Sequence, residues 1–234
     1  MRAMILAAGR GERMRPLTDT CPKPLLKVAG KPLIVWHILR LAQAGFHDIV
    51  INHAWLGEQI LDTLGHGEAL GVRLHYSAES PALETAGGIA HALHFFEGHA
   101  FLVVNSDIWC DWDPGTAIVA EKGMSETHQA HLVLVDNPVH HPAGDFVLQP
   151  DCQVALPVSG QSTLTYAGIG VFHPSLFAAL SLSRPAPLAP LLRAAMERHA
   201  VTGERHAGAW TDVGTPQRLA ELDCALRARP TRDC

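Results

Sequence analysis

The chain begins with an apolar run that leads directly into a glycine loop, Ala3-Met4-Ile5-Leu6-Ala7-Ala8-Gly9-Arg10-Gly11. A short apolar run that ends in glycines is typical of a buried parallel strand followed by a turn. The backbone N–H groups of such a loop can approach a polyphosphate closely. This stretch therefore predicts the first strand of an α/β sheet, over residues 3–7, with a candidate anion site at its carboxyl end.

Strand-like and helix-like segments alternate after this loop. We expect strands at residues 48–52, 72–76 and 100–104, and helices at residues 33–44, 56–64 and 85–96. Parallel strands need crossover connections, and helices at this spacing supply them with the usual right-handed sense. Residues 1–110 therefore predict the first half of a doubly wound sheet.

The second half is less regular but continues the α/β pattern. We expect strands at 130–135 and 165–172, a hairpin from 145–148 and 153–156, helices at 188–199 and 216–227, and one or two short strands within 201–212. No linker separates the halves. The fold expected is a single α/β domain over residues 1–234, with a Rossmann-like, doubly wound, mixed and mostly parallel sheet.

Composition excludes several classes of protein. The chain is 47% hydrophobic and 18% charged, which is an ordinary globular balance, and no apolar run approaches the roughly 18–20 residues that span a bilayer. Five dispersed cysteines argue against a disulfide framework or a CxxC zinc site, so we expect a reducing cytoplasm. The spacing of the fifteen histidines does not match His-Glu-x-x-His, and we expect them to be structural or solvent-facing.

Charge is distributed unevenly along the chain. The net charge of −5 argues against a nucleic-acid surface, yet residues 1–40 alone carry a net +6. Arg13, Arg15 and Lys23 fall in this basic segment, and such cations suit the charge that develops in phosphoryl transfer. The loop is not a Walker loop, since no Gly-Lys-Ser/Thr closes it, and it lacks the third glycine of the dinucleotide fingerprint.

Two aspartates are candidates for metal binding. Asp107 follows the apolar strand at 100–104, at the edge of the sheet where open α/β folds bind ligands, and Asp212 precedes the last helix. Two carboxylates together with nucleotide phosphates suit Mg²⁺, which prefers hard oxygen ligands. The alternative for each residue is an ordinary helix cap or turn.

The whole basic segment resembles the signature of the sugar-phosphate nucleotidyltransferases, the NDP-sugar pyrophosphorylases. The resemblance rests on residues 6–18, then Pro22-Lys23-Pro24-Leu25 and Gly30-Lys31-Pro32-Leu33, and continues in family order with Glu84-Thr85-Ala86-Gly87-Gly88, Asn105-Ser106-Asp107, Thr165-Tyr166-Ala167-Gly168-Ile169 and Trp210-Thr211-Asp212-Val213-Gly214-Thr215-Pro216. It implies a Rossmann-like fold and a reaction in which a nucleoside triphosphate and a sugar 1-phosphate give an NDP-sugar and pyrophosphate. Residues 1–110 would be the nucleotide-binding half and residues 111–234 the sugar-binding half.

The resemblance also implies roles for individual residues. Lys23 would act near the α-phosphate, Arg13 at the departing pyrophosphate, and Asp107 with Asp212 would hold Mg²⁺. The implied nucleotide-binding residues are Leu6, Ala7, Ala8, Gly9, Gly11, Glu12, Arg13, Lys23, Glu84, Thr85, Gly87 and Asn105, and the implied sugar-binding residues are Asp145, Thr165 and Gly168. Relatives often have glycine where Glu84 stands, and a plain hairpin turn is the alternative for Asp145.

One departure from the family concerns the acceptor. Many relatives carry a Val-Glu-Lys motif whose lysine holds the sugar phosphate, but residues 123–183 contain no Lys or Arg. We expect that phosphate to rely on Lys23, Mg²⁺ and an arginine such as Arg205.

The segments at 52–57, 132–138 and 144–146 point to particular substrates. They resemble most the members that join UTP to N-acetylmuramate 1-phosphate in cell-wall recycling. The alternatives are guanylyl transfer to mannose or heptose 1-phosphate and, more remotely, a non-catalytic protein that binds nucleotide sugars. No nucleic acid, membrane or protein partner is implied.

Overall fold

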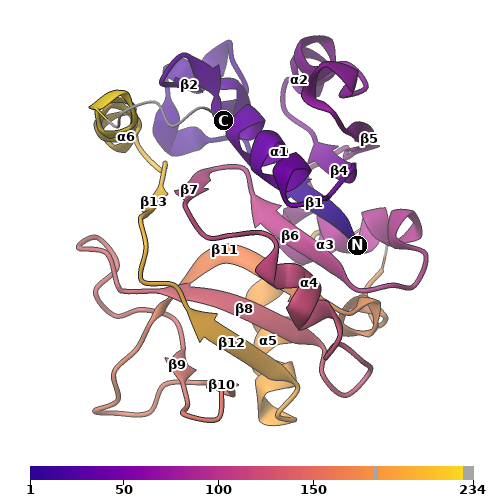
Figure 1. Cartoon of the computed structure of the whole chain (residues 1–234), viewed down its shortest axis with the longest axis vertical. Coiled ribbons are helices and arrows are strands. Elements are labelled where there is room, and N and C mark those ends of the chain that lie inside the picture. Colours follow the sequence, from indigo (N-terminus) through magenta and orange to yellow (C-terminus); the bar gives the residue numbers. More distant parts are fainter. Residues whose placement is uncertain (182–183, 229–234) are drawn as a thin grey trace.

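The computed structural model describes residues 1–181 and 184–228, which form a central sheet with helices on both faces (Figure 1). Seven strands pair in the order β12-β8-β11-β6-β1-β4-β5. Their bounds are Arg2–Leu6 (β1), Asp48–His53 (β4), Arg73–Ala78 (β5), Phe101–Asn105 (β6), Ala130–Val135 (β8), Thr165–Phe172 (β11) and Val201–Arg205 (β12). Only β11 in this sheet runs antiparallel to its neighbours, β6 and β8. The predicted mixed, mostly parallel sheet is confirmed.

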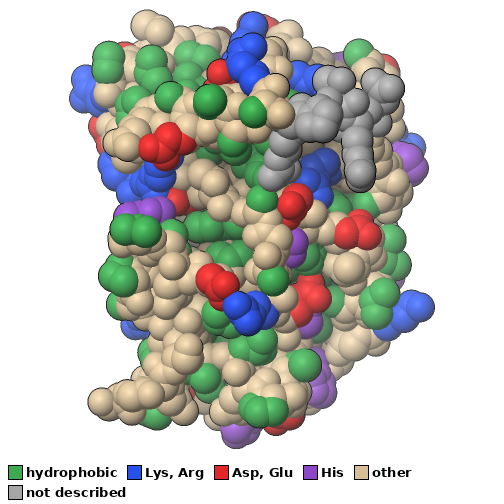
Figure 2. Space-filling model, turned by 60° about the vertical axis from the view of Figure 1, so that its left-hand side comes forward, with side chains coloured by type: hydrophobic (Ala, Val, Ile, Leu, Met, Phe, Trp, Pro, Cys, Tyr) green, Lys and Arg blue, Asp and Glu red, His purple; other side chains and the backbone are tan. Residues whose placement is uncertain are grey.

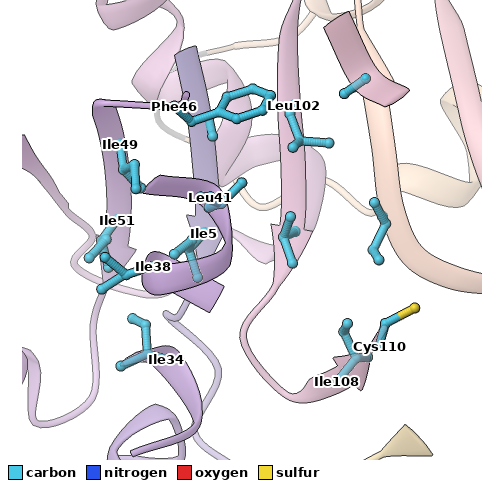
Figure 3. Packing of buried hydrophobic residues seen from close by; sticks show 14 of the residues in the cluster. Ile5, Ile34, Ile38, Leu41, Phe46, Ile49, Ile51, Leu102, Ile108 and Cys110 are labelled. Atoms are coloured by element: carbon cyan, nitrogen blue, oxygen red, sulfur yellow. The ribbon is translucent and has the colours of Figure 1, made fainter. Parts of the chain in front are cut away.

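The helices divide between the two faces of the sheet because side chains along each strand alternate. Ile5 and Ile51 pack with Ile34, Ile38 and Leu41 of one helix, as Figure 3 shows. Met4 and Val103 face the opposite side, where the second and separate core lies. The helices are α1 (Leu33–Gln43), α2 (Gly57–Leu64) and α4 (Thr116–Glu121) on the first face, α3 (Glu84–Ala92) and α5 (Leu188–Glu197) on the second, and α6 (Pro216–Ala228) beyond the sheet.

Short elements complete the chain. The small strands are β2 (Lys27–Val28) with β3 (Lys31–Pro32), β7 (Ile108–Cys110) with β13 (Trp210–Asp212), and β9 (Val147–Leu148) with β10 (Val154–Ala155). The 3₁₀ turns are Glu12–Met14, Leu17–Asp19, Lys23–Leu25, Glu68–Leu70, Leu93–Phe96 and Pro174–Phe177. The β9–β10 pair confirms the predicted hairpin.

The predicted helices and strands are all present, with ends shifted by up to four residues. The helix expected at 85–96 begins one residue earlier, at Glu84, and its last turn is 3₁₀. Thr85 therefore lies inside the first turn and does not cap the helix. The pairing of β7 with β13 and the helix α4 were not predicted. Within the described ranges, no helix has the length and apolar character to cross a bilayer.

A third core ties the last helix to the first loop. Met14, Val28, Trp109, Val213 and Leu222 are all buried in one cluster, so α6 packs beside β2 at the top left of Figure 1. The glycine loop after β1 is thus held from outside by residues more than 200 positions away in sequence.

The ribbon of β7 and β13 places two distant segments side by side. Asp212 pairs with Ile108, and the Val213 N–H donates to the carbonyl of Asp107 over 2.7 Å. The indole Nε1 of Trp210 donates to the carbonyl of Ala167 over 2.9 Å, which fastens the ribbon to β11. The backbones of Asp107 and Asp212 therefore lie side by side, just after the carboxyl end of β6.

Gly168 allows β11 to close onto the end of β6. The register of β11 against β8 shifts between Tyr166 and Gly170, and Gly168 within this bulge has φ +77°. A Cβ at Gly168 would lie 2.8 Å from Nδ2 of Asn105, so both backbone conformation and space require glycine.

We expect Gly168→Ala to destabilise the fold more than Gly160→Ala. Gly160 also has a positive φ, +84°, but open space surrounds it, so alanine there costs only the ~1–2 kcal/mol of the left-handed conformation. At Gly168 the close contact with Asn105 adds about 1–3 kcal/mol. Urea unfolding of both variants measures the difference, and equal losses would contradict the proposed contact.

Candidate active site

A cavity of about 440 Å³ lies at the carboxyl ends of β1, β4 and β6. Its lining contains all but one of the twelve predicted nucleotide-binding residues, together with Asp107. Sequence reasoning had not singled out the remaining lining residues, which are Met14, Pro24, Asn52, Ala82, Ser106 and Gly214. The structure thus brings residues from 6 to 214 around one space, at the edge of the sheet predicted for ligand binding.

The glycine loop is held in shape by Gly11. This residue has φ +69°, and a Cβ there would lie 3.1 Å from Cγ2 of Thr18 and 3.3 Å from Cβ of Lys23. The carbonyl of Gly11 accepts hydrogen bonds from Oγ1 of Thr18 and from the Met14 N–H, both over 2.9 Å. The loop therefore folds back on itself, and its inner side faces the cavity.

Arg10 and Trp55 fix the outer side of the same loop. The guanidinium carbon of Arg10 lies 3.9 Å from the centroid of the Trp55 ring, and both side chains donate to the carbonyl of Thr18. Arg10 and Arg15 also pair with Asp19, over 3.1 and 2.8 Å. Arg15 is thus used in the loop's own structure and lies outside the cavity lining.

The other two cations of this segment, Lys23 and Arg13, both line the cavity but differ in their partners. Lys23 is only 8% exposed, and its Nζ lies 2.6 Å from Oδ2 of Asp107. For Arg13, no hydrogen bond or ion pair is found with any described residue, although it lines the cavity. A buried ammonium next to a carboxylate and an uncommitted guanidinium are suited to hold separate groups of one polyphosphate.

A buried network that the sequence did not reveal supports the cavity. Oδ1 of Asn52 accepts from the Ala7 N–H over 2.8 Å, and Nδ2 donates to Oε1 of Glu79 over 2.7 Å. Oε2 of Glu79 accepts from the Leu83 N–H over 2.7 Å. Polar residues at the ends of buried strands are a signal that such networks exist, but their partners cannot be read from the sequence.

The first turn of α3 explains one departure from the family pattern. Glu84 has φ +58°, a conformation that favours glycine, which matches the glycine that relatives often carry there. Thr85 lines the cavity, but Gly87 does not. The Gly87 N–H donates to the carbonyl of Ala186, and a Cβ at Gly87 would lie 2.7 Å from the Arg184 carbonyl oxygen. Gly87 thus serves packing against residues 184–186.

The chemistry of Asp107 and Asp212 suits a divalent cation, because carboxylate oxygens are the ligands that such an ion prefers. Both carboxylates are partly exposed, at 40% and 24% of the side chain. Asp107 directly precedes β7 and lines the cavity, whereas Asp212 ends β13 and lies outside the lining. Each carboxylate is balanced by a cation in this structure, because Asp107 pairs with Lys23, and Asp212 accepts from Nη1 of Arg218 over 2.6 Å and lies 2.8 Å from Nε2 of His140.

His37 lies beneath the turn between β6 and β7. Burial lowers the pKa of His37 to about 4, against the opposing effect of Asp107 and of the carbonyls of Ile108 and Ser106. The imidazole is therefore neutral at pH 7 and adds no charge below Asp107.

The three predicted sugar-binding residues lie outside the cavity lining, on the side of β11. Oδ2 of Asp145 accepts from the Tyr166 N–H over 2.8 Å, and Oδ1 lies 3.0 Å from Nε2 of His141. Oγ1 of Thr165 donates to Oδ1 of Asn137 over 2.9 Å. Gly168 contacts Asn105, so it connects this group to the cavity.

Arg205 is committed to another carboxylate. It forms a two-pronged pair with Asp136, over 2.9 and 2.8 Å, and both side chains are exposed. Strands β8 and β11 separate β12, which carries Arg205, from β6. The structure therefore does not bring Arg205 to Asp107 and Asp212.

A second cluster of polar side chains lies near the ribbon. The ligand atoms of Cys110, Asp111 and His206 all lie within 4.8 Å of one another, and Nε2 of His206 lies 2.8 Å from Oδ1 of Asp111. Burial raises the pKa of the Cys110 thiol to about 11, so the thiol is protonated at neutral pH. Sequence spacing could not reveal this group, because 95 positions separate Asp111 from His206.

Comparison with known proteins places the chain in a family. Residues 2–229 match the model of a family described as nucleotidyl transferase. The chain belongs to the nucleotidyl transferase family. The chain is therefore a nucleotidyltransferase, and the cavity with its glycine loop and Lys23 beside Asp107 is the candidate for its active site.

Individual relatives of this nucleotidyltransferase differ in their substrates. It is 56% identical to the N-acetylmuramate alpha-1-phosphate uridylyltransferase of Neisseria meningitidis serogroup B, over 97% of this chain and 99% of the relative. It is 32% identical to a mannose-1-phosphate guanyltransferase of Hypocrea jecorina, over 99% of this chain and 66% of that protein. A putative glucose-1-phosphate thymidylyltransferase from Bacillus anthracis, crystallised with a sucrose, shares the fold at 21% identity, with a TM-score of 0.86 over 100% of this chain and 98% of that chain.

We expect Asn52→Ala to weaken both the fold and nucleotide binding. The substitution leaves the Ala7 N–H and the buried Glu79 carboxylate without their partner, which costs about 1–3 kcal/mol and more where the group is charged. Ser77 is the matched control, since it pairs with Asn52 across β4 and β5 and its buried hydroxyl has no partner among the described residues. Urea unfolding and UTP titration should show a loss for Asn52→Ala and near-neutral behaviour for Ser77→Ala. Equal behaviour of the two variants would rule out a supporting role for Asn52.

Proposed function

We propose that this nucleotidyltransferase transfers the uridylyl group of UTP to N-acetylmuramate 1-phosphate, giving UDP-N-acetylmuramate and pyrophosphate, as a step of cell-wall recycling. The observation that carries the proposal is the 56% identity to a uridylyltransferase of that name over nearly the full length of both chains. The cavity agrees with it, because it combines a glycine loop, cations and carboxylates at the edge of the sheet. The free thiols of Cys21, Cys110, Cys152 and Cys224 are consistent with a reducing cytoplasm.

The geometry suggests how the triphosphate lies. The loop from Gly9 to Arg13 would face the β- and γ-phosphates, with the uncommitted Arg13 on the pyrophosphate that departs. Lys23 would stand at the α-phosphate, since its ammonium is buried between this loop and Asp107. Charge that develops during transfer would meet cations already in position, which is the main source of catalysis in phosphoryl transfer.

We propose Mg²⁺ as the ion that Asp107 and Asp212 hold. Bound there, Mg²⁺ would neutralise phosphate charge and orient the α-phosphate. The two carboxylates and Lys23 would then fix the position at which the acceptor oxygen attacks. We propose direct in-line attack, because the motifs place electrostatic groups and no nucleophilic side chain at this point.

The acceptor would lie on the β11 side of the cavity, near Asp145, Thr165 and Gly168. N-acetylmuramate 1-phosphate carries a lactyl carboxylate as well as a phosphate, so acidic groups would repel it. Residues 152–181 contain no Asp or Glu but several hydroxyl groups and glycines. Neutral hydrogen bonds from such a segment would accommodate the carboxylate. Asp145, which already accepts from the Tyr166 N–H, would face sugar hydroxyls.

The acceptor and the nucleobase are tested together by competition. We expect UTP with N-acetylmuramate 1-phosphate to give the highest kcat/KM when UTP and GTP, and equal concentrations of several sugar 1-phosphates, are supplied in one assay. Mass spectrometry of the nucleotide sugars formed identifies the preferred pair. A higher kcat/KM for GTP with mannose 1-phosphate would replace the proposal with guanylyl transfer, and an absence of any pyrophosphate release would favour a binding protein.

We expect Lys23→Ala to lower kcat far more than it raises the KM for UTP. The charge of Lys23 is needed most as the α-phosphoryl group is transferred, and loss of a preorganised contact of this kind typically costs about 10²–10³ in rate. Lys27→Ala is the control, because Lys27 is an exposed cation four residues away. A change in KM with unchanged kcat would show that Lys23 anchors only the ground state.

A further inference from the structure

The acceptor side of the active site needs a cation that residues 123–183 do not supply. If the acceptor is a sugar 1-phosphate, as proposed above, its phosphate must lie beside Asp107 and Asp212, because its oxygen attacks the α-phosphorus there. Yet residues 123–183, whose described part carries the strands β8 to β11, contain no Lys or Arg. The cation must therefore come from another part of the chain.

Arg218 lies at the required place. It stands in the first turns of α6, six residues after Asp212, and its side chain is only 16% exposed. Nη1 lies 2.6 Å from Oδ2 of Asp212. A Cβ at Gly214 would lie 2.4 Å from Nη2, and Gly214 lines the cavity. Nη2 of the guanidinium therefore lies against Gly214, a residue of the cavity wall, although Arg218 itself lies outside the lining.

His140 connects this arginine to the acceptor side. Nε2 of His140 lies 2.6 Å from Nη1 of Arg218 and 2.8 Å from Oδ1 of Asp212. His140 belongs to the loop that also carries His141 and Asp145, the residue predicted to contact the sugar. The three side chains thus join the β7–β13 ribbon, helix α6 and the acceptor loop at one point.

We propose that Arg218, oriented by Asp212 and His140, binds the phosphate of the sugar 1-phosphate acceptor and takes the part that a strand lysine has in many relatives. A guanidinium is suited to this task, because its planar fork can keep Nη1 on a carboxylate while Nη2 donates to a phosphate oxygen. The proposal rests on the proposed function for the class of acceptor, but it does not depend on which sugar the phosphate carries.

The test compares Arg218→Ala and Arg218→Lys with Arg227→Ala. Arg227 is the matched control, since it lies on the same helix and pairs with Asp223 over 2.7 Å, away from the cavity. We expect Arg218→Ala to lower kcat/KM for the acceptor about 10- to 100-fold, as for loss of a charged hydrogen bond, with the KM for UTP nearly unchanged. Arg218→Lys should recover part of the loss, and Arg227→Ala should behave as wild type.

A second variant tests the geometry without removing the charge. Gly214→Ala places a methyl group 2.4 Å from the present position of Nη2 and 3.1 Å from Oδ2 of Asp212, so the guanidinium must move. We expect this variant to raise the KM for the acceptor as Arg218→Ala does, and the double variant to lose no more than either single one. Isothermal titration of inorganic phosphate, a probe without sugar or base, should show weaker binding in both single variants, and thermal unfolding checks that each remains folded.

The outcomes separate this inference from the proposed function. The acceptor is whichever sugar 1-phosphate the wild-type enzyme turns over, so a preference for mannose 1-phosphate would overturn the function and leave the test of Arg218 intact. An unchanged acceptor KM and phosphate affinity in folded Arg218→Ala, or a larger effect of Arg205→Ala, would overturn the assignment. A rise in the KM for UTP alone would show that Arg218 contacts the nucleotide and not the acceptor.

Discussion

The contact between Lys23 and Asp107 is the interaction on which the site depends. It joins the loop after β1 to the end of β6, and it holds an ammonium in a nearly buried position. An ammonium removed from water needs a compensating charge at close range, so Lys23 depends on Asp107 for its place. Gly11 leaves the space that Lys23 fills, and Met14 anchors the same loop in the third core. The shape of the nucleotide site follows from these constraints.

Much of the fold and the nucleotide half of the site could be predicted because the relevant signals are local. The apolar strands, the glycines after β1 and the prolines around Lys23 each act within a few residues, and alternation of helix and strand then leaves few topologies. The structure accordingly collects Gly11, Arg13 and Lys23 in one cavity. Gly87 shows the limit of this reasoning. It leaves space for residues 184–186, but sequence alone cannot distinguish such a glycine from one that leaves space for a ligand.

The parts that could not be predicted are those where distant segments meet. Strands β7 and β13 have three residues each, too few for a periodic signal, yet their pairing sets Asp212 beside Asp107. Asn52 and Glu79 are ordinary polar residues until β4 and the loop before α3 enclose them. Arg218 likewise could not be predicted, because only the position of α6 places it beside Asp212, and that position depends on the third core.

The third core has a consequence for the order in which the site forms during folding. Leu222 and Val213 lie about 200 positions after Met14 of the glycine loop, yet they pack in one cluster with it. Contacts between residues so far apart in sequence form only after the loop-closure entropy of the intervening chain has been lost. Until they form, the nucleotide loop has no outer support and Asp107 has no neighbouring Asp212. We therefore expect folding to complete the site only after β1, β4, β5 and β6 have paired.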